Sequence, residues 1–293
     1  MRETETPLTD LRQRIDRIDD QIHDLVIARA ALVDEIRRTK RTSGAPVIQP
    51  QRETAMLRRL AARHKGNFPL AALVRIWREM IAAFTHLQQP LAVAVYAPED
   101  MPGGWDLARD HFGSIVPMSA YQTIGQVFRA VTDRSATVGV VPVPQEQDDD
   151  PWWRQLLSGD SAGPRVFARL PATDRGNARG AGDVLAIACQ VGDLSAVDHS
   201  LIVVEVANSS SRMKVISSLG AAGFSGALVA VSNHDRLYLI LLDIDGPVTL
   251  DDPRFGELGA QLGTPLERVY HLGGYAEPIR SDAAARPGAP HGG

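Results

Sequence analysis

One uninterrupted helical pattern near the start of the chain limits the folds that are open to it. Apolar residues recur there at steps of three and four, with charged residues between them: Leu8, Leu11, Ile15, Ile18, Ile22, Leu25, Val26, Leu32, Val33 and Ile36. Thr6 is a candidate N-cap, Pro7 suits the first helical position, and no Gly or Pro follows before Gly44. At 1.5 Å per residue such a helix is about 50 Å long, too long for a small globular domain. The pattern therefore predicts that another surface covers this apolar stripe.

Two shorter helical stretches follow, at about 50–64 and 69–89, and Gly66 and Asn67 separate them. Three helices, one of them exceptionally long, predict an all-α domain at residues 1–90 that forms an intertwined homodimer. This segment holds 16 Lys+Arg against 11 Asp+Glu, although the net charge of the whole chain is −4. A basic segment can attract nucleic acid or a small anion, and the positions of its arginines distinguish the two.

The pattern changes to alternating strands and helices after Pro90. Apolar runs predict strands at 91–96, 114–118, 137–143 and 183–191, with helices at 104–112 and 122–133. Residues 91–195 are therefore expected to form a small α/β region with an open parallel sheet. Segments 145–150 and 174–182 are rich in Asp, Gly, Pro and Ala and are expected to be loops.

The last region has a β-α-β-β-α-β order. Strands are predicted at 201–206, 226–232, 237–244 and 268–275, with helices at 210–222 and 252–262. This order is typical of an α+β ferredoxin-like domain, here at residues 200–279. Residues 280–293 are expected to be a disordered tail. The chain as a whole is thus predicted to be multidomain.

Cationic residues of the first segment lie in step with its apolar stripe. Arg29 and Lys40 are separated by nearly three helical turns, so both face the apolar side, where an unpaired cation is costly. Arg12 lies about 25 Å before Arg29 along the helix axis, too far for one small ligand to reach both in one chain. If two long helices run antiparallel, Arg12 of one chain comes near Arg29 of the other. This arrangement favours two equivalent sites, each shared between chains and suited to a small multivalent anion.

At these positions the sequence resembles the all-helical chorismate mutases over about residues 7–89. The motifs are LTDLRQRIDRIDDQIHDLVIARAALVDEIRRTK, then PVIQPQRETAMLRRL, then IWREMIAAFTHLQ. The resemblance implies the rearrangement of chorismate to prephenate, a concerted pericyclic step that requires no nucleophile, metal or cofactor. Catalysis then consists of holding the dianionic substrate in its reactive shape and stabilising charge on its ether oxygen.

The resemblance also implies a role for each matching residue. Arg29 and Arg12 of the partner subunit would bind the carboxylates, with Arg52 supporting one carboxylate end. Lys40 and Gln88 would donate hydrogen bonds to the ether oxygen. Glu53 would accept a hydrogen bond from the ring hydroxyl.

Two positions depart from the pattern of these mutases. Gln49 stands where they usually have Asp, and it retains an acceptor that can reach a hydroxyl. Phe84 stands where they usually have Ser, so a hydroxyl is lost and bulk is added at the pocket or at the dimer contact. Both residues are expected to bind substrate, with reduced or altered activity as a consequence.

The remaining chain resembles the regions that follow such a mutase in bifunctional enzymes. Residues 91–143 are similar to the first part of prephenate dehydratase, in LAVAVYAPED, QTIGQVFRAV and VGVVPV. The family's Thr-Arg-Phe motif is absent where the strand begins at Asp183, and 146–183 is too short for a second lobe, so a truncated, inactive region is expected. Residues 200–279 are similar to an ACT domain, although Ala207–Arg212 replace its Gly-Ala-Leu loop. The resemblance to an ACT domain implies an aromatic amino acid effector.

The prediction is therefore a dimeric chorismate mutase, with a bifunctional mutase–dehydratase or a catalytically impaired regulatory protein as alternatives. A single cysteine, Cys189, provides no disulfide or cysteine cluster, and no metal or cofactor is expected. The polar N-terminus and the lack of a long apolar run favour a cytoplasmic protein without a membrane segment. With only Lys40 and Lys65 as lysines in residues 1–90, nucleic acid is not expected as a partner.

Overall fold

The computed structural model describes residues 7–43, 45–146, 148, 150–157, 163–180, 182–207, 210–234 and 237–280. The side chains of residues 34, 40–43 and 234 lie outside this description, and so does the predicted tail except Arg280. The helices are α1 Leu8–Ser43, α2 Pro50–Arg63, α3 Leu70–Gln88, α4 Gly103–Phe112, α5 Ile124–Thr132, the 3₁₀ helix η1 Trp152–Leu156, α6 Arg212–Ala221 and α7 Arg254–Leu262. The strands are β1 Val93–Tyr96, β2 Met118–Tyr121, β3 Val138–Pro142, β4 Arg165–Leu170, β5 Val184–Ala188, β6 His199–Val206, β7 Gly226–His234, β8 Leu237–Asp245 and β9 Leu266–Tyr275.

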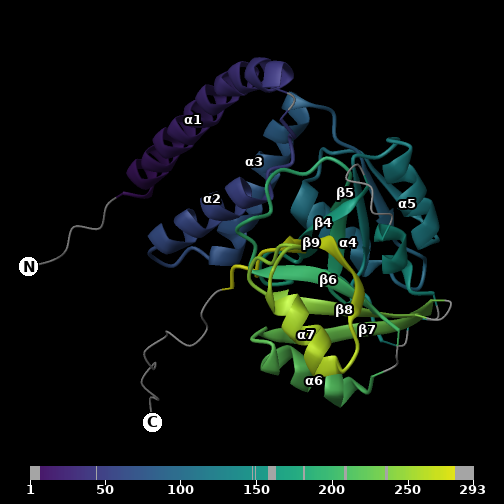
Figure 1. The fold of residues 1–293 in the computed structure, drawn as a ribbon. Helices are drawn as coiled ribbons and strands as arrows, with labels where there is room; N and C mark the ends of the chain where they lie inside the picture. Colours follow the sequence, from purple (N-terminus) through teal and green to yellow (C-terminus); the bar gives the residue numbers. More distant parts are fainter. Residues whose placement is uncertain are drawn as a thin grey trace, which may run out of the picture.

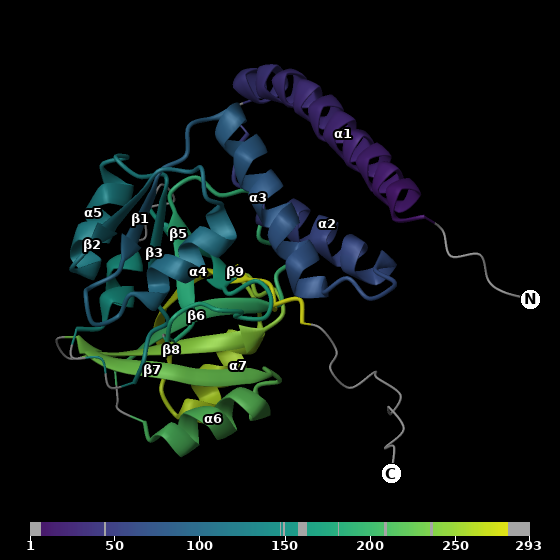
Figure 2. The same cartoon turned by 180° about the vertical axis from the view of Figure 1, so that it is seen from behind.

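Helix α1 confirms the long helical pattern predicted at the start of the chain. It lies apart from the sheet, and α2 and α3 lie between the two (Figures 1 and 2). Its apolar side chains remain between 40% and 70% exposed at Leu8, Leu11, Ile15, Ile18, Ile22, Leu25, Ile27 and Leu32. Val33 of the stripe that the sequence marks for burial is buried, but most of the stripe is uncovered within one chain. Among the described residues, no helix combines the length and apolarity of a membrane span.

Helices α2 and α3 form a short antiparallel pair beside α1. Helix α2 begins at Pro50, whose fixed φ suits the first turn. Leu57 of α2 packs with Val74 and Ile81 of α3 in a small buried cluster. The pair places one face of α3 toward α1 and another toward α4, and both α1 and α4 contact α3.

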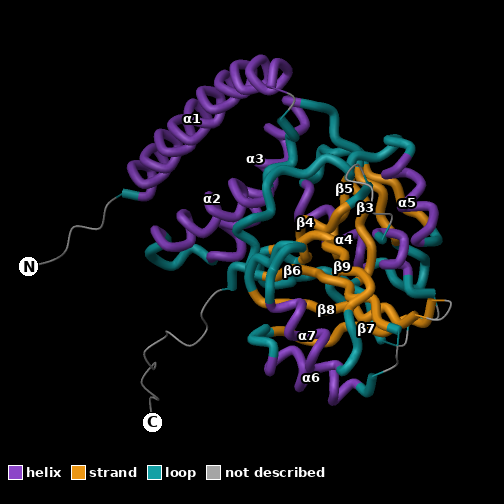
Figure 3. Tube along the Cα trace, in the orientation of Figure 1, coloured by secondary structure: helices purple, strands orange, loops and turns teal. Residues whose placement is uncertain are grey.

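The strands form one continuous sheet of nine, in the order β2-β1-β3-β5-β4-β9-β6-β8-β7. In Figure 3 the strands lie between α1, α2 and α3 on one side and α6 and α7 on the other. Strand β1 pairs in parallel with β2 and β3, as the sequence predicts for this region, whereas β5 runs antiparallel to β3 and β4. The last four strands pair antiparallel in the order β9-β6-β8-β7.

Two strands differ most from the sequence prediction. Strand β2 begins at Met118 rather than at 114, because this edge strand is largely exposed and its apolar pattern is weak. No strand is predicted between 146 and 183, yet β4 lies there. It has six residues between Pro164 and Pro171, with arginine at two of them, so its apolar run is too short to indicate a strand.

Buried side chains continue across the sheet from the middle region to the last region. On one face, Val127 of α5 and Trp153 of η1 share a core with Leu185 of β5 and Val203 of β6. Helices α6 and α7 cover the opposite face of the last strands through a separate core that includes Ile240. The middle and last regions thus share one sheet and one core.

The two regions of the sheet join where β4 meets β9, at the pair Val166 and Gly273. Gly273 has a φ of +127°, and a Cβ atom there would lie 2.0 Å from the main-chain oxygen of Val166. Only glycine therefore permits this close approach of two backbones.

We expect Gly273→Ala to lower the free energy of unfolding by at least about 3 kcal/mol, because both the backbone strain and the clash oppose the native pairing. Urea denaturation followed by tryptophan fluorescence measures the change. Gly256→Ala in α7 is the matched control, since a Cβ there meets nothing within 4 Å, and it should stabilise by about 0.5 to 1 kcal/mol. Equal effects of the two changes would contradict this account of the junction.

Candidate active site

A cavity of about 460 Å³ lies between α1, α2, α3 and the segment that joins α1 to α2. Apolar side chains form much of its wall, among them Leu32, Val33 and Met56. Six of the eight residues that the sequence predicts for the site line it: Arg29, Gln49, Arg52, Glu53, Phe84 and Gln88. An apolar cavity with a few convergent polar groups is the usual form of a small-molecule site.

Arg29 is the cation that the cavity leaves least satisfied. Its guanidinium lies over the Phe84 ring, 4.4 Å from the centroid, and its Nη2 contacts the Met56 sulfur at 3.8 Å. Its Nη1 is buried and has no hydrogen-bond partner among the described residues. Burial, and then the neighbouring Arg52 cation, lower the pKa of Arg29 from its ordinary value. A buried donor beside a second cation fits an anionic ligand, which would supply both the acceptor and the opposite charge.

Gln88 lies at the end of α3 and presents its carbonyl rather than its amino group as the free polar atom. Its Nε2 donates to the main-chain oxygen of Phe84 at 3.2 Å, and its Oε1 is buried without a hydrogen-bond partner among the described residues. The donor function predicted for Gln88 therefore requires its amide to turn when a ligand binds.

Gln49 is held by the segments on either side of it. Its Nε2 donates to the main-chain oxygen of Pro46 at 2.7 Å. Ile48 forms a bridge with Val191, and a Cβ at Gly192 would lie 3.1 Å from the Gln49 carboxamide. A segment far along the chain thus lies against Ile48 and Gln49, which the sequence does not indicate.

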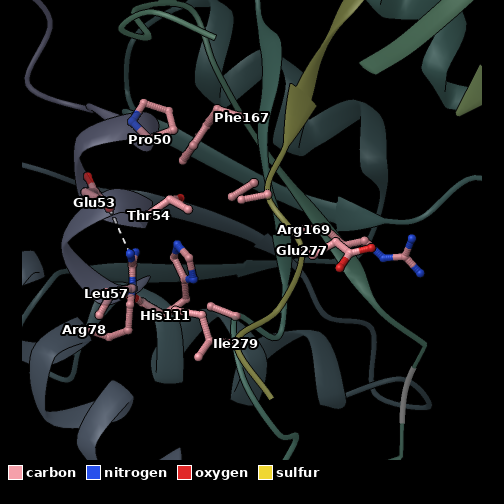
Figure 4. Close-up of a pocket in the computed structure, with 13 residues that line it drawn as sticks. Pro50, Glu53, Thr54, Leu57, Arg78, His111, Phe167, Arg169, Glu277 and Ile279 are labelled. Atoms are coloured by element: carbon pink, nitrogen blue, oxygen red, sulfur yellow. Dashed lines mark hydrogen bonds and ion pairs between the residues drawn. The ribbon is translucent and has the colours of Figure 1, made fainter. Parts of the chain in front are cut away.

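Glu53 faces a second, smaller cavity of about 50 Å³ as well as the first (Figure 4). Its Oε2 accepts a hydrogen bond of 2.9 Å from Nη1 of Arg78, and Nε of Arg78 donates to the main-chain oxygen of His111 at 3.1 Å. The His111 ring lines the smaller cavity, and its Nδ1 is buried without a hydrogen-bond partner among the described residues. Burial, and then the Arg78 charge, hold the pKa of His111 well below its usual range.

Two predicted site residues are not brought to the cavity in this chain. Arg12 is exposed near the other end of α1 and does not line the cavity, as the helix length predicts. The backbone of Lys40 belongs to α1, but its side chain lies outside the described residues. Their functions remain predictions.

Arg78 is a residue of this region that the sequence analysis does not single out. It lies in step with Val74, Ile81 and Thr85 on the buried face of α3. A cation within an apolar helical stripe is the same signal that marks Arg29, so the pattern could have indicated it.

We expect Phe84→Leu to lower the free energy of unfolding by about 1 to 2 kcal/mol, because it removes the ring beneath the Arg29 guanidinium and leaves a small void. Phe68→Leu is the control, since Phe68 is 52% exposed between α2 and α3. Its change should stay within about 0.5 kcal/mol. Urea denaturation compares the two variants, and a Phe84→Leu effect no larger than the control would contradict the packing described.

Comparison with known proteins confirms the predicted resemblance of the helical segment. Residues 11–89 match the family model described as chorismate mutase type II. The bifunctional chorismate mutase/prephenate dehydratase of Stutzerimonas stutzeri is 35% identical over 138 residues, which cover 45% of this chain and 38% of that protein. The protein of the same name from Aquifex aeolicus is 35% identical over 140 residues, covering 46% of this chain and 38% of that protein. The chain therefore spans less than half the length of these relatives.

Solved structures show weaker likeness. The prephenate dehydratase of Streptococcus mutans aligns with a TM-score of 0.44 and 13% identity, covering 65% of this chain and all of that chain. The prephenate dehydratase of Arthrobacter aurescens, in complex with L-Phe, aligns with a TM-score of 0.43 and 12% identity, covering 64% of this chain and 90% of that chain. The family match, at residues 11–89, includes every residue that lines the larger cavity.

Proposed function

We propose that this protein rearranges chorismate to prephenate in the larger cavity. The observation that carries the proposal is the convergence of Arg29, Arg52, Glu53 and Gln88 on one cavity, with a buried Arg29 donor that has no described partner. These groups come from the segment that matches the chorismate mutase type II model. Two adjacent cations suit the two carboxylates of chorismate, and the apolar walls exclude water from the reacting bonds.

The chemistry requires no covalent step from the protein, so its residues act by position and charge. The arginines hold the dianion so that its two reacting carbons approach each other. Lys40 is proposed to donate to the ether oxygen as the carbon–oxygen bond breaks, together with Gln88 once its amide has turned. A donor that strengthens its bond only as charge develops lowers the barrier rather than tightening ground-state binding.

The second subunit of the proposed intertwined homodimer completes each site. Support comes from the exposed apolar stripe of α1, which a second copy of the same helix can cover. An antiparallel copy would also bring Arg12 of the partner subunit toward Arg29.

We further propose an ACT-like, ferredoxin-like unit at residues 200–279. Its support is the connection β6-α6-β7-β8-α7-β9 with the antiparallel strand order β9-β6-β8-β7. An aromatic amino acid effector for this unit and a cytoplasmic location remain predictions from the sequence.

Two other functions are distinguished by direct assay. The names of the relatives favour a bifunctional mutase–dehydratase, which would form phenylpyruvate from prephenate. Two observations favour a regulatory protein without turnover. The Phe84 ring covers the Arg29 guanidinium, and Nε2 of Gln88 donates to the main-chain oxygen of Phe84. Absence of chorismate loss in the purified protein would support the regulatory function and contradict the mutase.

We expect Lys40→Ala and Arg29→Ala each to lower kcat/KM for chorismate by about 100- to 1000-fold, as for removal of a preorganised donor. Chorismate consumption and prephenate formation measure the rate. Arg59→Ala is the control, because Arg59 is exposed on α2 and does not line the cavity. A wild-type rate that both site variants retain would show that the chemistry occurs elsewhere.

We expect mixed dimers of Arg12→Ala and Arg29→Ala chains to regain activity, because one of their two sites then holds both arginines. Random pairing after co-expression should restore about a quarter of the wild-type rate per dimer. Arg29→Ala mixed with Lys40→Ala is the control. Those two side chains are proposed to come from one chain, so no intact site can form. Recovery in both mixtures, or in neither, would contradict the shared site.

A further inference from the structure

Glu53 lines two cavities. One is the larger cavity of the proposed mutase, and the other lies between α2, α3, α4, β4 and the segment after β9 (Figure 4). Arg78 approaches Glu53 from the side of the smaller cavity and binds Oε2. No other hydrogen bond to this carboxylate is present among the described residues, so Oε1 is available to a ligand.

The position of Arg78 is fixed more tightly than that of an ordinary helical arginine. Its side chain is only 7% exposed, and its Nε–H is taken by the main-chain oxygen of His111 at the end of α4. The His111 ring is buried and its lowered pKa keeps it neutral near pH 7, so it brings no charge against the guanidinium. Among the described residues Arg78 forms one ion pair, with Glu53.

Because Arg78 is held in place, the Glu53 side chain that it binds is also restricted in its rotamers. A glutamate side chain on a helix surface samples several rotamers, and holding one of them for a ligand costs free energy on each binding event. A buried guanidinium that is already anchored at His111 removes that cost beforehand. The anchor is a main-chain carbonyl of α4, so residues beyond 90 take part in shaping a site that the helical segment lines.

We infer that Arg78 is a positioning residue for the proposed mutase site. It orients the Glu53 carboxylate so that Oε2 is occupied and Oε1 accepts a hydrogen bond from the ring hydroxyl of the substrate. The inference rests on the proposed function, and it adds a structural task for α4, which holds Arg78. The hydroxyl is present in both the bound substrate and the transition state, so the contribution is uniform binding.

Steady-state kinetics with chorismate test the inference through KM and kcat separately. Arg78→Met should raise KM about tenfold while kcat changes by less than about threefold, the signature of lost uniform binding. Glu53→Gln should do the same. In the Glu53→Gln background, Arg78→Met should alter KM by less than about twofold, because the residue through which it acts is already changed. Arg78→Lys, which keeps the charge, should recover part of the loss.

Arg75→Met is the matched control. Arg75 lies on the same helix and also pairs across to α4, through Asp110 at 3.3 Å, but it does not line either cavity. This variant should leave KM unchanged. If Arg78→Met alone fails to fold, Glu53→Gln with Arg78→Met removes both charges, and comparison with Glu53→Gln still decides the question.

The outcomes separate this inference from the proposed function. If the wild type turns over chorismate and Arg78→Met has the same kinetics as Arg75→Met, the positioning function alone is overturned. Additive effects of Arg78→Met and Glu53→Gln would overturn it too. Absence of turnover in the wild type would overturn the proposed function, and the inference with it.

Discussion

The free-energy cost of burying a guanidinium group determines which partners the arginines around both cavities require. A cation removed from water must find an opposite charge and hydrogen-bond acceptors within the protein. Arg78 finds both, in the Glu53 carboxylate and the main-chain oxygen of His111. Arg29 finds an aromatic face and a thioether, and one of its donors stays without a described partner. The first arginine is therefore satisfied by the fold, and the second is suited to a ligand.

Helix α3 contributes residues both to the larger cavity and to the contact with the α/β region. One side of it carries Phe84 and Gln88 into the larger cavity, while Arg75, Arg78 and Glu79 point toward the region after residue 90. Glu79 accepts hydrogen bonds from the main chain and hydroxyl of Ser114. These contacts join the helical segment to the α/β region through charged groups rather than through apolar packing alone. The cavity wall and the contact with the α/β region are consequently formed by two faces of one helix.

The local patterns of the chain predict most elements and one cavity residue, Arg29, whereas the other five predicted residues that line the cavity are implied by the resemblance to the helical chorismate mutases. Periodicity identifies α1 because its apolar positions repeat without interruption, and it places Arg29 on the buried side. It does not identify β4, whose short run between two prolines has no clear alternation. Nor does it show that Gly192 lies against Gln49, because that contact depends on how segments far apart in the sequence meet. Long-range contacts of this kind are set by tertiary packing, which single-sequence patterns do not encode.

The exposed stripe of α1 would connect the stability of the proposed dimer with the chemistry of the proposed site. Each fully buried aliphatic side chain contributes about 1.5 to 3 kcal/mol relative to an exposed one, so a helix with this many exposed leucines and isoleucines is strongly favoured to acquire a cover. Arg12 lies on the same helix, about 25 Å from Arg29 along its axis. A cover provided by an antiparallel copy would bury the stripe and deliver Arg12 of the partner subunit to the cavity in one association step. In the proposed dimer the length of α1 would serve both purposes, because a shorter helix could be covered by its copy but could not reach the other site.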